Sequence, residues 1–269
     1  MQRVWSPAVL GLIAISGLLC GFAGAASADE AAPASEATAP GEPAAPLTAI
    51  SDAAPDSPEM TSPGAEPDLP PVFSKIGPEG PDDLRAIQAH IRSLVARLTE
   101  CTVSVQIGPA QGSGVIVTAD GYVLTAAHVS GKPGRAVDVV LADGRHVDGI
   151  TYGRDDTLDA GLIKLNSGTN WPHTDMAPAD SIRFGEWCLS TGHPGGFQEG
   201  RTPVVRLGRV VFATSRVIQS DCELVGGDSG GPLFDMQGRV IGINSRIGED
   251  TQANFHVPIG AYAKSWERL

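Results

Sequence analysis

The hydrophobic positions of this chain follow two different periods. Over residues 81–100, apolar side chains recur every three or four residues, which is the spacing of one face of an α-helix. Pro81 and the acidic pair Asp82-Asp83 suit the first turn of such a helix. The repeating positions are Leu84, Ile87, Ile91, Leu94 and Leu98. The pattern predicts an amphipathic helix that covers one end of a domain.

From Thr102 onward, short apolar runs follow one another and are separated by Gly, Asp and Pro, which is typical of strands and turns. Ala119-Asp120-Gly121 and Ala142-Asp143-Gly144 carry the residues of hairpin turns. No helix-length pattern lies between the runs, which disfavours a parallel α/β fold. The predicted strands are Thr102–Ile107, Val115–Thr118, Tyr122–Thr125, Ala136–Leu141, Gly161–Leu165, Trp187–Thr191, Val204–Phe212, Val240–Asn244 and Ala253–Val257.

These strands fall into two groups, about 102–166 and 182–257, joined by a looser stretch. The grouping predicts an all-β protein with two antiparallel barrels and a cleft between them. Residues 258–269 are expected to close the chain with a short helix. Glycine is abundant, at 33 residues, and aromatic residues make up only 5% of the chain, which suits many short strands and turns.

The N-terminal 28 residues resemble a secretory signal. Arg3 precedes the apolar stretch Ala8–Ala26, and Ala26-Ser27-Ala28 offers a small-residue cleavage site. An uncleaved membrane anchor and a lipid-modified Cys20 are the alternatives. In each case we expect the folded part to be secreted or periplasmic, with a membrane tether if the segment is not cleaved.

Residues 29–74 contain Ala, Pro, Ser, Thr and acidic residues but few large apolar groups. Nine acidic residues and no Lys or Arg fall in this segment, within a chain of formal charge -12. Such a composition predicts a disordered, extended linker, followed by a helical lead-in over residues 75–100 and a folded domain over residues 101–269. No basic patch indicates nucleic-acid binding.

Cysteine and histidine spacing indicates neither metal nor cofactor. Cys20 lies in the N-terminal segment, which leaves Cys101, Cys188 and Cys222 in the folded part. Three cysteines allow at most one internal disulfide, and the spacing does not choose among the three pairings. No zinc-type cluster and no calcium loop is present, so we expect no cofactor.

Residues 226–233, GGDSGGPL, place Ser229 between glycines. Glycines let the backbone turn sharply, so the N–H groups of Gly227 and Ser229 could converge on a developing oxyanion. The alternative is an ordinary Gly-rich turn. A nucleophilic serine needs a base and a carboxylate elsewhere. His128 follows a predicted strand in TAAH, and Asp159 directly precedes the strand Gly161–Leu165, where it could orient the histidine.

Taken together, these stretches resemble a trypsin-fold (chymotrypsin-like) serine protease, whose triad order is His, Asp, Ser. The likeness is closest to the HtrA/Deg-type protease domain. The matching stretches are GSGVIVTADGYVLTAAHV, ADGR at 142–145, DAGLIKL at 159–165, GEWCLSTGHPGG at 185–196 and residues 219–232. The resemblance implies two six-stranded barrels, with His128 as base, Asp159 as its orienting acid, Ser229 as nucleophile, and the N–H groups of Gly227 and Ser229 as the oxyanion hole.

The same resemblance implies residues that bind the substrate. Ser245 would support Asp159 and pair with the peptide backbone, and Arg246 and Ile247 would flank the bound peptide. Glu223 and Leu224 fall where trypsin-fold enzymes build the primary specificity pocket. A carboxylate at Glu223 would favour basic side chains, whereas a solvent-facing Glu223 would leave the small-aliphatic preference of HtrA-type pockets.

Two departures from the HtrA pattern stand out. Asp228 replaces the asparagine usual before the serine, and a buried aspartate needs a partner. We expect an arginine of the segment Gly195–Arg206, Arg201 first, with backbone hydrogen bonds as the alternative. The stretch after the last predicted strand is also expected to be too short for a PDZ domain. His193 and His256 could line the cleft without a catalytic role.

The sequence therefore predicts a serine endopeptidase that hydrolyses extracytoplasmic polypeptides through an acyl-enzyme intermediate. The alternative is a non-catalytic or self-inhibited protease-fold module that binds peptides. The sequence leaves the oligomeric state open.

Overall fold

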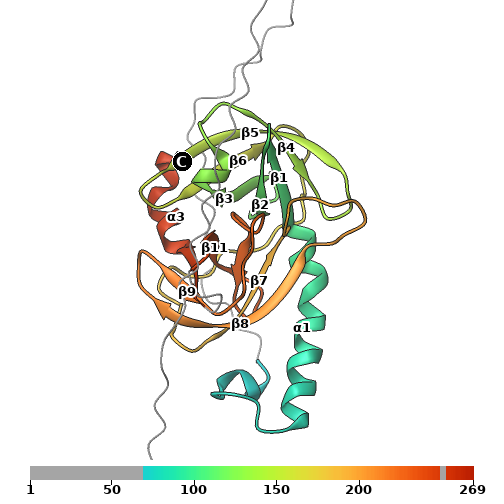
Figure 1. Cartoon of the computed structure of the whole chain (residues 1–269), viewed down its shortest axis with the longest axis vertical. Coiled ribbons are helices and arrows are strands. Elements are labelled where there is room, and N and C mark those ends of the chain that lie inside the picture. The colour runs from blue at the N-terminus through green and yellow to red at the C-terminus, as the bar shows by residue number, and fades with distance from the viewer. Residues whose placement is uncertain (1–68, 249–252) are drawn as a thin grey trace, which may run out of the picture. The chain divides into compact units, whose positions relative to one another are not determined.

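The computed structural model describes residues 69–248 and 253–269 (Figure 1). The predicted signal segment and nearly all of the predicted linker lie outside these described residues. Within them, no helix is long and apolar enough to cross a membrane.

The first half of the folded part is a closed antiparallel barrel in the order β1-β2-β3-β6-β5-β4. Hairpins join β2 to β3 and β4 to β5, at the two predicted Asp-Gly turns. The first and last strands in this order, β1 and β4, also pair with each other, with Val105 opposite Val139, and this pairing closes the barrel. The strands are β1 (Thr102–Ile107), β2 (Ala110–Ile116), β3 (Tyr122–Ala126), β4 (Ala136–Val140), β5 (His146–Asp155) and β6 (Ala160–Leu165).

The second half repeats this plan as a closed barrel in the order β10-β11-β12-β9-β8-β7. Its strands are β7 (Trp187–Gly192), β8 (Val204–Ala213), β9 (Ile218–Ser220), β10 (Pro232–Phe234), β11 (Val240–Arg246) and β12 (Asn254–Pro258). Every pairing in both barrels is antiparallel. The predicted fold class, two six-stranded barrels, is confirmed.

Three strands were absent from the expected set. β5 has no continuous apolar run, because its buried positions are Gly149, Thr151 and Gly153, which alternate with half-exposed Ile150, Tyr152 and Arg154. β9 and β10 are three residues each, too short to show a period. The closure of the barrel, rather than local preference, supplies the pairing partners that make these segments strands.

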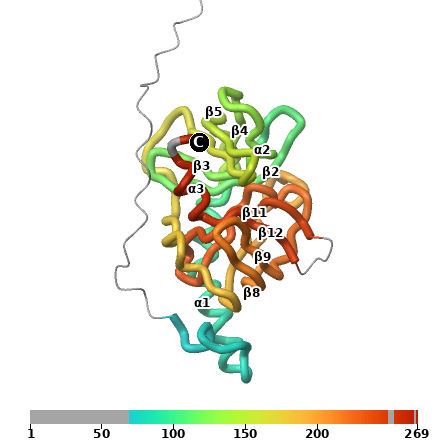
Figure 2. Tube along the Cα trace, turned by 90° about the vertical axis from the view of Figure 1, so that its left-hand side faces the viewer, coloured from blue at the N-terminus to red at the C-terminus, as the bar shows by residue number. Residues whose placement is uncertain are grey.

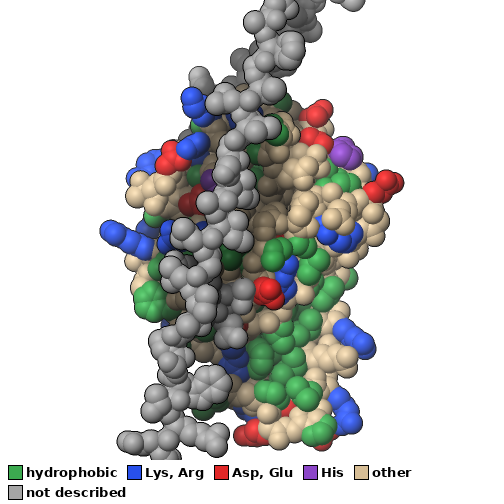
Figure 3. Space-filling view, viewed as in Figure 1, with side chains coloured by type: hydrophobic (Ala, Val, Ile, Leu, Met, Phe, Trp, Pro, Cys, Tyr) green, Lys and Arg blue, Asp and Glu red, His purple; other side chains and the backbone are tan. Residues whose placement is uncertain are grey.

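Helix α1 (Pro81–Cys101) matches the predicted amphipathic helix and buries Ile87, Leu94 and Leu98. It lies beside the second barrel, where His90 Nε2 is 2.7 Å from the carbonyl oxygen of Met236. Hydrophobic side chains gather along the lower half of the face shown in Figure 3, where α1 lies. A short 3-10 helix, η1 (Pro71–Ser74), precedes it.

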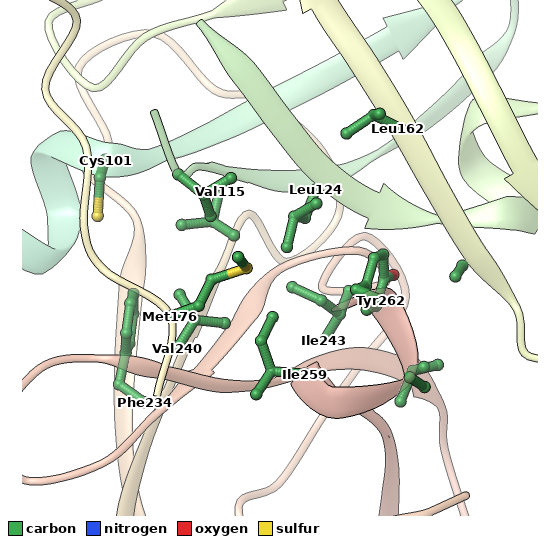
Figure 4. Packing of buried hydrophobic residues seen from close by; sticks show 14 of the residues in the cluster. Cys101, Val115, Leu124, Leu162, Met176, Phe234, Val240, Ile243, Ile259 and Tyr262 are labelled. Atoms are coloured by element: carbon green, nitrogen blue, oxygen red, sulfur yellow. The ribbon is translucent and has the colours of Figure 1, made fainter. Parts of the chain in front are cut away.

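The last elements are α3 (Ile259–Ser265) and η2 (Trp266–Arg268), which agree with the short helix predicted over residues 258–269. Tyr262 of α3 donates a hydrogen bond to the carbonyl of Thr125 in β3, so the helix ties the barrel of β12 to the barrel of β3 (Figure 2). The largest core cluster is shared: Val115 and Leu124 of the first barrel meet Ile243 of the second (Figure 4). A common core of this kind holds the facing ends of the barrels in one arrangement.

Candidate active site

His128 lies directly after a strand end. β3 ends at Ala126, and helix α2 (Ala127–Ser130) begins at the next residue, with His128 in its single turn. Ala126 and Ala127 are buried, and a Cβ at Gly161 of β6 would clash with Ser130 Oγ. Small residues therefore let α2 pack closely against β6 and hold His128 over the end of that strand.

His128 is paired with Asp159. Its Nδ1 atom lies 3.0 Å from both carboxylate oxygens, and its backbone N–H donates to Oδ1 over 3.1 Å. Asp159 has a φ of 59°, a left-handed conformation that non-glycine residues rarely adopt. This turn, directly before β6, aims the carboxylate back at the histidine. Because the ring N–H donates to the carboxylate, Nε2 is left as the basic nitrogen.

The two pKa shifts agree with this pairing. The hydrogen bond to Asp159 raises the pKa of His128, and burial opposes it. Burial acts to raise the pKa of Asp159, but the hydrogen bonds from His128 and Ser245 outweigh it, so this pKa is lowered. The carboxylate is therefore ionised near neutral pH and stabilises the imidazolium form.

Ser245 on β11 completes the surroundings of this carboxylate. Its hydroxyl donates to Asp159 Oδ2 over 2.5 Å. Asp159 belongs to the first barrel and Ser245 to the second, so the bond crosses between the barrels. The structure thus brings His128, Asp159 and Ser245 into one hydrogen-bonded group.

Ser229 lies in the turn before β10 and is held from both barrels. Its carbonyl accepts from Ser113 N–H over 2.8 Å, and the next residue, Gly230, donates to the carbonyl of Asn244 over 2.7 Å. A Cβ at Gly230 would clash with Thr125 Oγ1, at the strand end that carries His128. Among the described residues, the Ser229 hydroxyl makes no hydrogen bond to His128.

The turn before Ser229 needs glycine. Gly227 has a φ of 98°, and a Cβ there would clash with the carbonyl oxygen of His193. Gly195 N–H donates to the carbonyl of Gly226 over 2.6 Å, which fixes the peptide group that ends in the Gly227 nitrogen. Within residues 69–248 and 253–269, no hydrogen bond uses the backbone N–H groups of Gly227 and Ser229.

Asp228 is fully buried, and its partner is Arg206 rather than the expected Arg201. Arg206 approaches both carboxylate oxygens, at 3.2 and 3.0 Å, and Val225 N–H donates to Oδ2 over 2.9 Å. Arg201 instead donates to the carbonyls of Pro194 and Gly196, at 2.7 and 2.5 Å. Burial raises the pKa of Asp228, against the lowering effect of Val225 N–H and Arg206.

Strand periodicity could have identified Arg206. On β8, Arg206 has the same parity as Gly208 and Val210, which are buried inside the second barrel. Arg201 precedes the strand and has no such constraint. The arginine that pairs with Asp228 does come from the predicted segment, but the prediction of Arg201 was wrong, because Arg206 lies on the side of β8 that faces the core.

The predicted specificity residues occupy different surroundings. Glu223 is exposed and Leu224 is buried. Arg246 and Ile247, at and just beyond the end of β11, are exposed, and the guanidinium of Arg246 lies 4.9 Å from the centre of the Phe255 ring. Both residues follow Ser245 along the same segment.

His193 and His256 are buried, and His256 is among the residues that line the pocket next to Asp159 and Ser245. His256 lies 2.7 Å from Ser220 Oγ and 2.9 Å from Asn244 Oδ1, and burial lowers its pKa to about 3. Burial, with Arg201 nearby, lowers the pKa of His193 to about 4. Both rings are therefore neutral near pH 7. Across the described part of the chain, no group of three or more His, Cys, Asp or Glu side chains could hold a metal ion.

Comparison with known proteins gives one consistent result. Residues 112–243 match the trypsin-like peptidase domain family. A probable periplasmic DegP-like serine endoprotease of Ectopseudomonas mendocina is 39% identical over 140 residues, covering 51% of this chain and 29% of the relative. A putative Do-like protease of Arabidopsis thaliana is 32% identical over 187 residues, covering 61% and 42%.

Two solved structures share the fold. The serine endoprotease of Yersinia pestis has a TM-score of 0.58 at 26% identity, over 65% of each chain. The HtrA-type protease AlgW, solved with a tripeptide, has a TM-score of 0.56 at 28% identity, over 64% of this chain and 61% of AlgW. The chain thus spans less than half the length of the two curated relatives. The barrels and these matches together show the trypsin-like fold, and within it the chain is similar to DegP-like and HtrA-type proteases.

Proposed function

We propose that this domain is a serine endopeptidase that cleaves extracytoplasmic polypeptides. The observation that carries the proposal is the contact of His128 with Asp159, whose second oxygen accepts from Ser245. This arrangement orients the imidazole, keeps its proton on Nδ1 and leaves Nε2 free to act as a base. The periplasmic serine endoproteases among the relatives support the same reaction and compartment.

In the proposed reaction, His128 Nε2 takes the proton from Ser229 Oγ as the oxygen attacks the scissile carbonyl. The free N–H groups of Gly227 and Ser229 bind the oxyanion that forms. The imidazolium then protonates the leaving amine, and an acyl-enzyme on Ser229 remains. Water, deprotonated by His128, releases the acid and regenerates the enzyme. Asp159 stays ionised throughout and stabilises the imidazolium.

A second candidate is a self-inhibited or non-catalytic module of the same fold that binds peptides. The observation that favours it is the Ser229 hydroxyl, which makes no hydrogen bond to His128 within the described residues. In this case the nucleophile would need a partner or substrate to become aligned.

A fluorescent fluorophosphonate separates the two candidates, because it labels only an activated serine. We expect labelling of the purified chain, loss of labelling in Ser229→Ala and a slow rate in His128→Ala. Ser93→Ala, an exposed serine on α1, serves as the matched control and should label as the parent does. No labelling of the parent chain, with or without denatured protein substrate, would contradict the endopeptidase.

A further inference from the structure

A pocket of about 380 Å³ is lined by Asp159 and Ser245, and Ser229 is not among its lining residues. Its walls come from the turn before β6, the turn between β8 and β9, the end of β11, and β12. The strands β9, β11 and β12 lie side by side in Figure 2. Two arginines, Arg216 and Arg246, line it. We call it the Arg216–Arg246 pocket. Because two residues of the proposed catalytic group line it, a peptide bound at the site passes over it.

The two arginines of this pocket form no ion pair with the described residues. Both arginines are exposed, and neither guanidinium has a carboxylate within ion-pair distance among residues 69–248 and 253–269. The carboxylates in the pocket walls have other partners: Asp156 pairs with Arg154, and the ionised Asp159 is hydrogen-bonded to His128 and Ser245. Two guanidiniums without an ion-pair partner among the described residues therefore lie next to the candidate catalytic group.

Arg246 is also held in position. Its guanidinium lies 4.9 Å from the centre of the Phe255 ring on the neighbouring strand, a cation–π contact that limits its movement. An arginine positioned in this way presents its remaining N–H donors to a carboxylate with less loss of side-chain entropy.

The backbone beside Arg246 offers an open strand edge. β11 pairs with β12 as far as Arg246, but its pairing with β10 ends at Ile243, and only Asn244 continues it through Gly230 and Gly231. In the described part of the chain, no strand covers that side of residues 245–247. An extended peptide that adds a strand there has its side chains next to the pocket.

We propose that the Arg216–Arg246 pocket selects polypeptides with an acidic side chain two to four residues before the scissile bond. This selectivity rests on the proposed endopeptidase function. A substrate carboxylate would form charge-assisted hydrogen bonds with one or both guanidiniums. Because both arginines are exposed, the preference is moderate, about three- to fivefold for an ion pair in this setting, and it is sensitive to salt.

The test compares quenched fluorescent peptides that differ only by Glu or Gln at the second, third or fourth residue before the cleaved bond. We expect kcat/KM to be about three- to fivefold higher for Glu at one of these positions, and the ratio to fall when salt is raised. Arg246→Gln and Arg216→Gln should each reduce the ratio, and the double variant should bring it close to one. The double charge reversal to Glu should favour Lys over Gln at that position.

Arg145→Gln is the matched control, because Arg145 is exposed, pairs with Asp143 and lies outside the pocket. It should keep the parent ratio. A Glu-to-Gln ratio of kcat/KM equal to one in the parent, or a parent-like ratio in the double variant, would overturn the selectivity. Cleavage of the Gln peptides would still support the proposed endopeptidase. If nothing is cleaved and fluorophosphonate does not label Ser229, the proposed function fails instead. In that case the selectivity can be tested as binding, by fluorescence anisotropy of labelled Glu and Gln peptides with Ser229→Ala. Equal Kd values for the two peptides would overturn it.

Discussion

Arg206 contacts both carboxylate oxygens of Asp228, the residue directly before Ser229, at 3.2 and 3.0 Å. Asp228 is fully buried, and the side chain of Arg206 is 17% exposed. The ion pair links β8 to the turn that presents Gly227 and Ser229. The shape of the candidate oxyanion hole therefore depends on a residue from a distant part of the chain.

Removing this arginine should damage both stability and reactivity. Arg206→Gln leaves a buried carboxylate without its charged partner, so we expect the free energy of unfolding to fall by on the order of 3 kcal/mol. Fluorophosphonate labelling should slow, because the turn loses its anchor. Urea unfolding and labelling rates measure the two effects.

The double variant Arg206→Gln with Asp228→Asn tests the cause, since an asparagine still accepts the Val225 N–H and carries no charge. We expect it to recover part of the stability. Arg145→Gln, which breaks only an exposed pair, should change stability by less than about 0.5 kcal/mol. A single Arg206→Gln protein that unfolds and labels like the parent would mean that Asp228 does not require the guanidinium.

Gly227→Ala should remove most of the reactivity of Ser229. The added Cβ meets the carbonyl of His193 and the nitrogens of Gly195 and Gly196, and the φ of 98° is strained for alanine. The turn must shift, and loss of one oxyanion donor costs about 10²–10³ in rate. The labelling rate measures it.

Gly226→Ala is the neighbouring control, because a Cβ there meets nothing within 4 Å and its φ is not in the left-handed region. It should label far faster than Gly227→Ala. Equal losses in both variants would argue against a specific role for the Gly227 N–H.

The pH dependence should follow His128. Its pKa is raised by Asp159, so kcat/KM for a neutral peptide should rise with pH through an apparent pKa above 6.5. Asp159→Asn removes the acceptor of the Nδ1 proton, so the imidazole loses its tautomer and we expect the rate to fall by about 10⁴. The acid limb of the profile should also move to lower pH. A pH–rate profile of both proteins measures the shift.

The pairing of His128 with Asp159 should also make the free energy of unfolding depend on pH. A raised folded-state pKa means that His128 stabilises the fold fully below pH 6.5 and that this contribution is lost as pH rises through the raised value. The lowered pKa of Asp159 works in the opposite direction: its contribution is present above pH 3.8 and is lost as pH falls. His128→Ala should flatten the first of these slopes in urea unfolding curves, and an unchanged slope would contradict the pairing.

The three cysteines of the folded part should be unreactive in the native protein. All three are buried as free thiols, and burial raises the pKa of Cys101 to about 12. The Sγ atoms of Cys188 and Cys222 lie 3.8 Å apart, so the structure brings together one of the three possible pairs. We expect slow alkylation at pH 8 without denaturant and fast modification of all three thiols in guanidinium. Mass spectrometry without reductant checks this: two cysteines that stay unmodified in denaturant would show that this pair is oxidised.

The sequence pattern was sufficient to predict those elements whose own residues show a helical period, a strand run or turn residues. The helical spacing predicted one apolar face for α1. Ile87, Leu94 and Leu98 are buried on it and Ile91 is half-buried, whereas Leu84 in the first turn is 57% exposed. The alternation of apolar runs and turn residues predicted the barrels. The glycines around Ser229 predicted a sharp turn, because φ > 0 and close backbone approach can be inferred from residue type.

What only the tertiary structure decided is which distant side chains meet. The strands β9 and β10 exist because the barrel closes on them, and their three residues carry no period of their own. Periodicity along β8 favours Arg206 over Arg201, but only the closed barrel brings that side of β8 to Asp228. Arg216 joins Arg246 beside Asp159 only when two turns and two strand ends converge. Residue type and spacing determine local conformation and chemistry, whereas pairings across long loops depend on packing that no local pattern encodes.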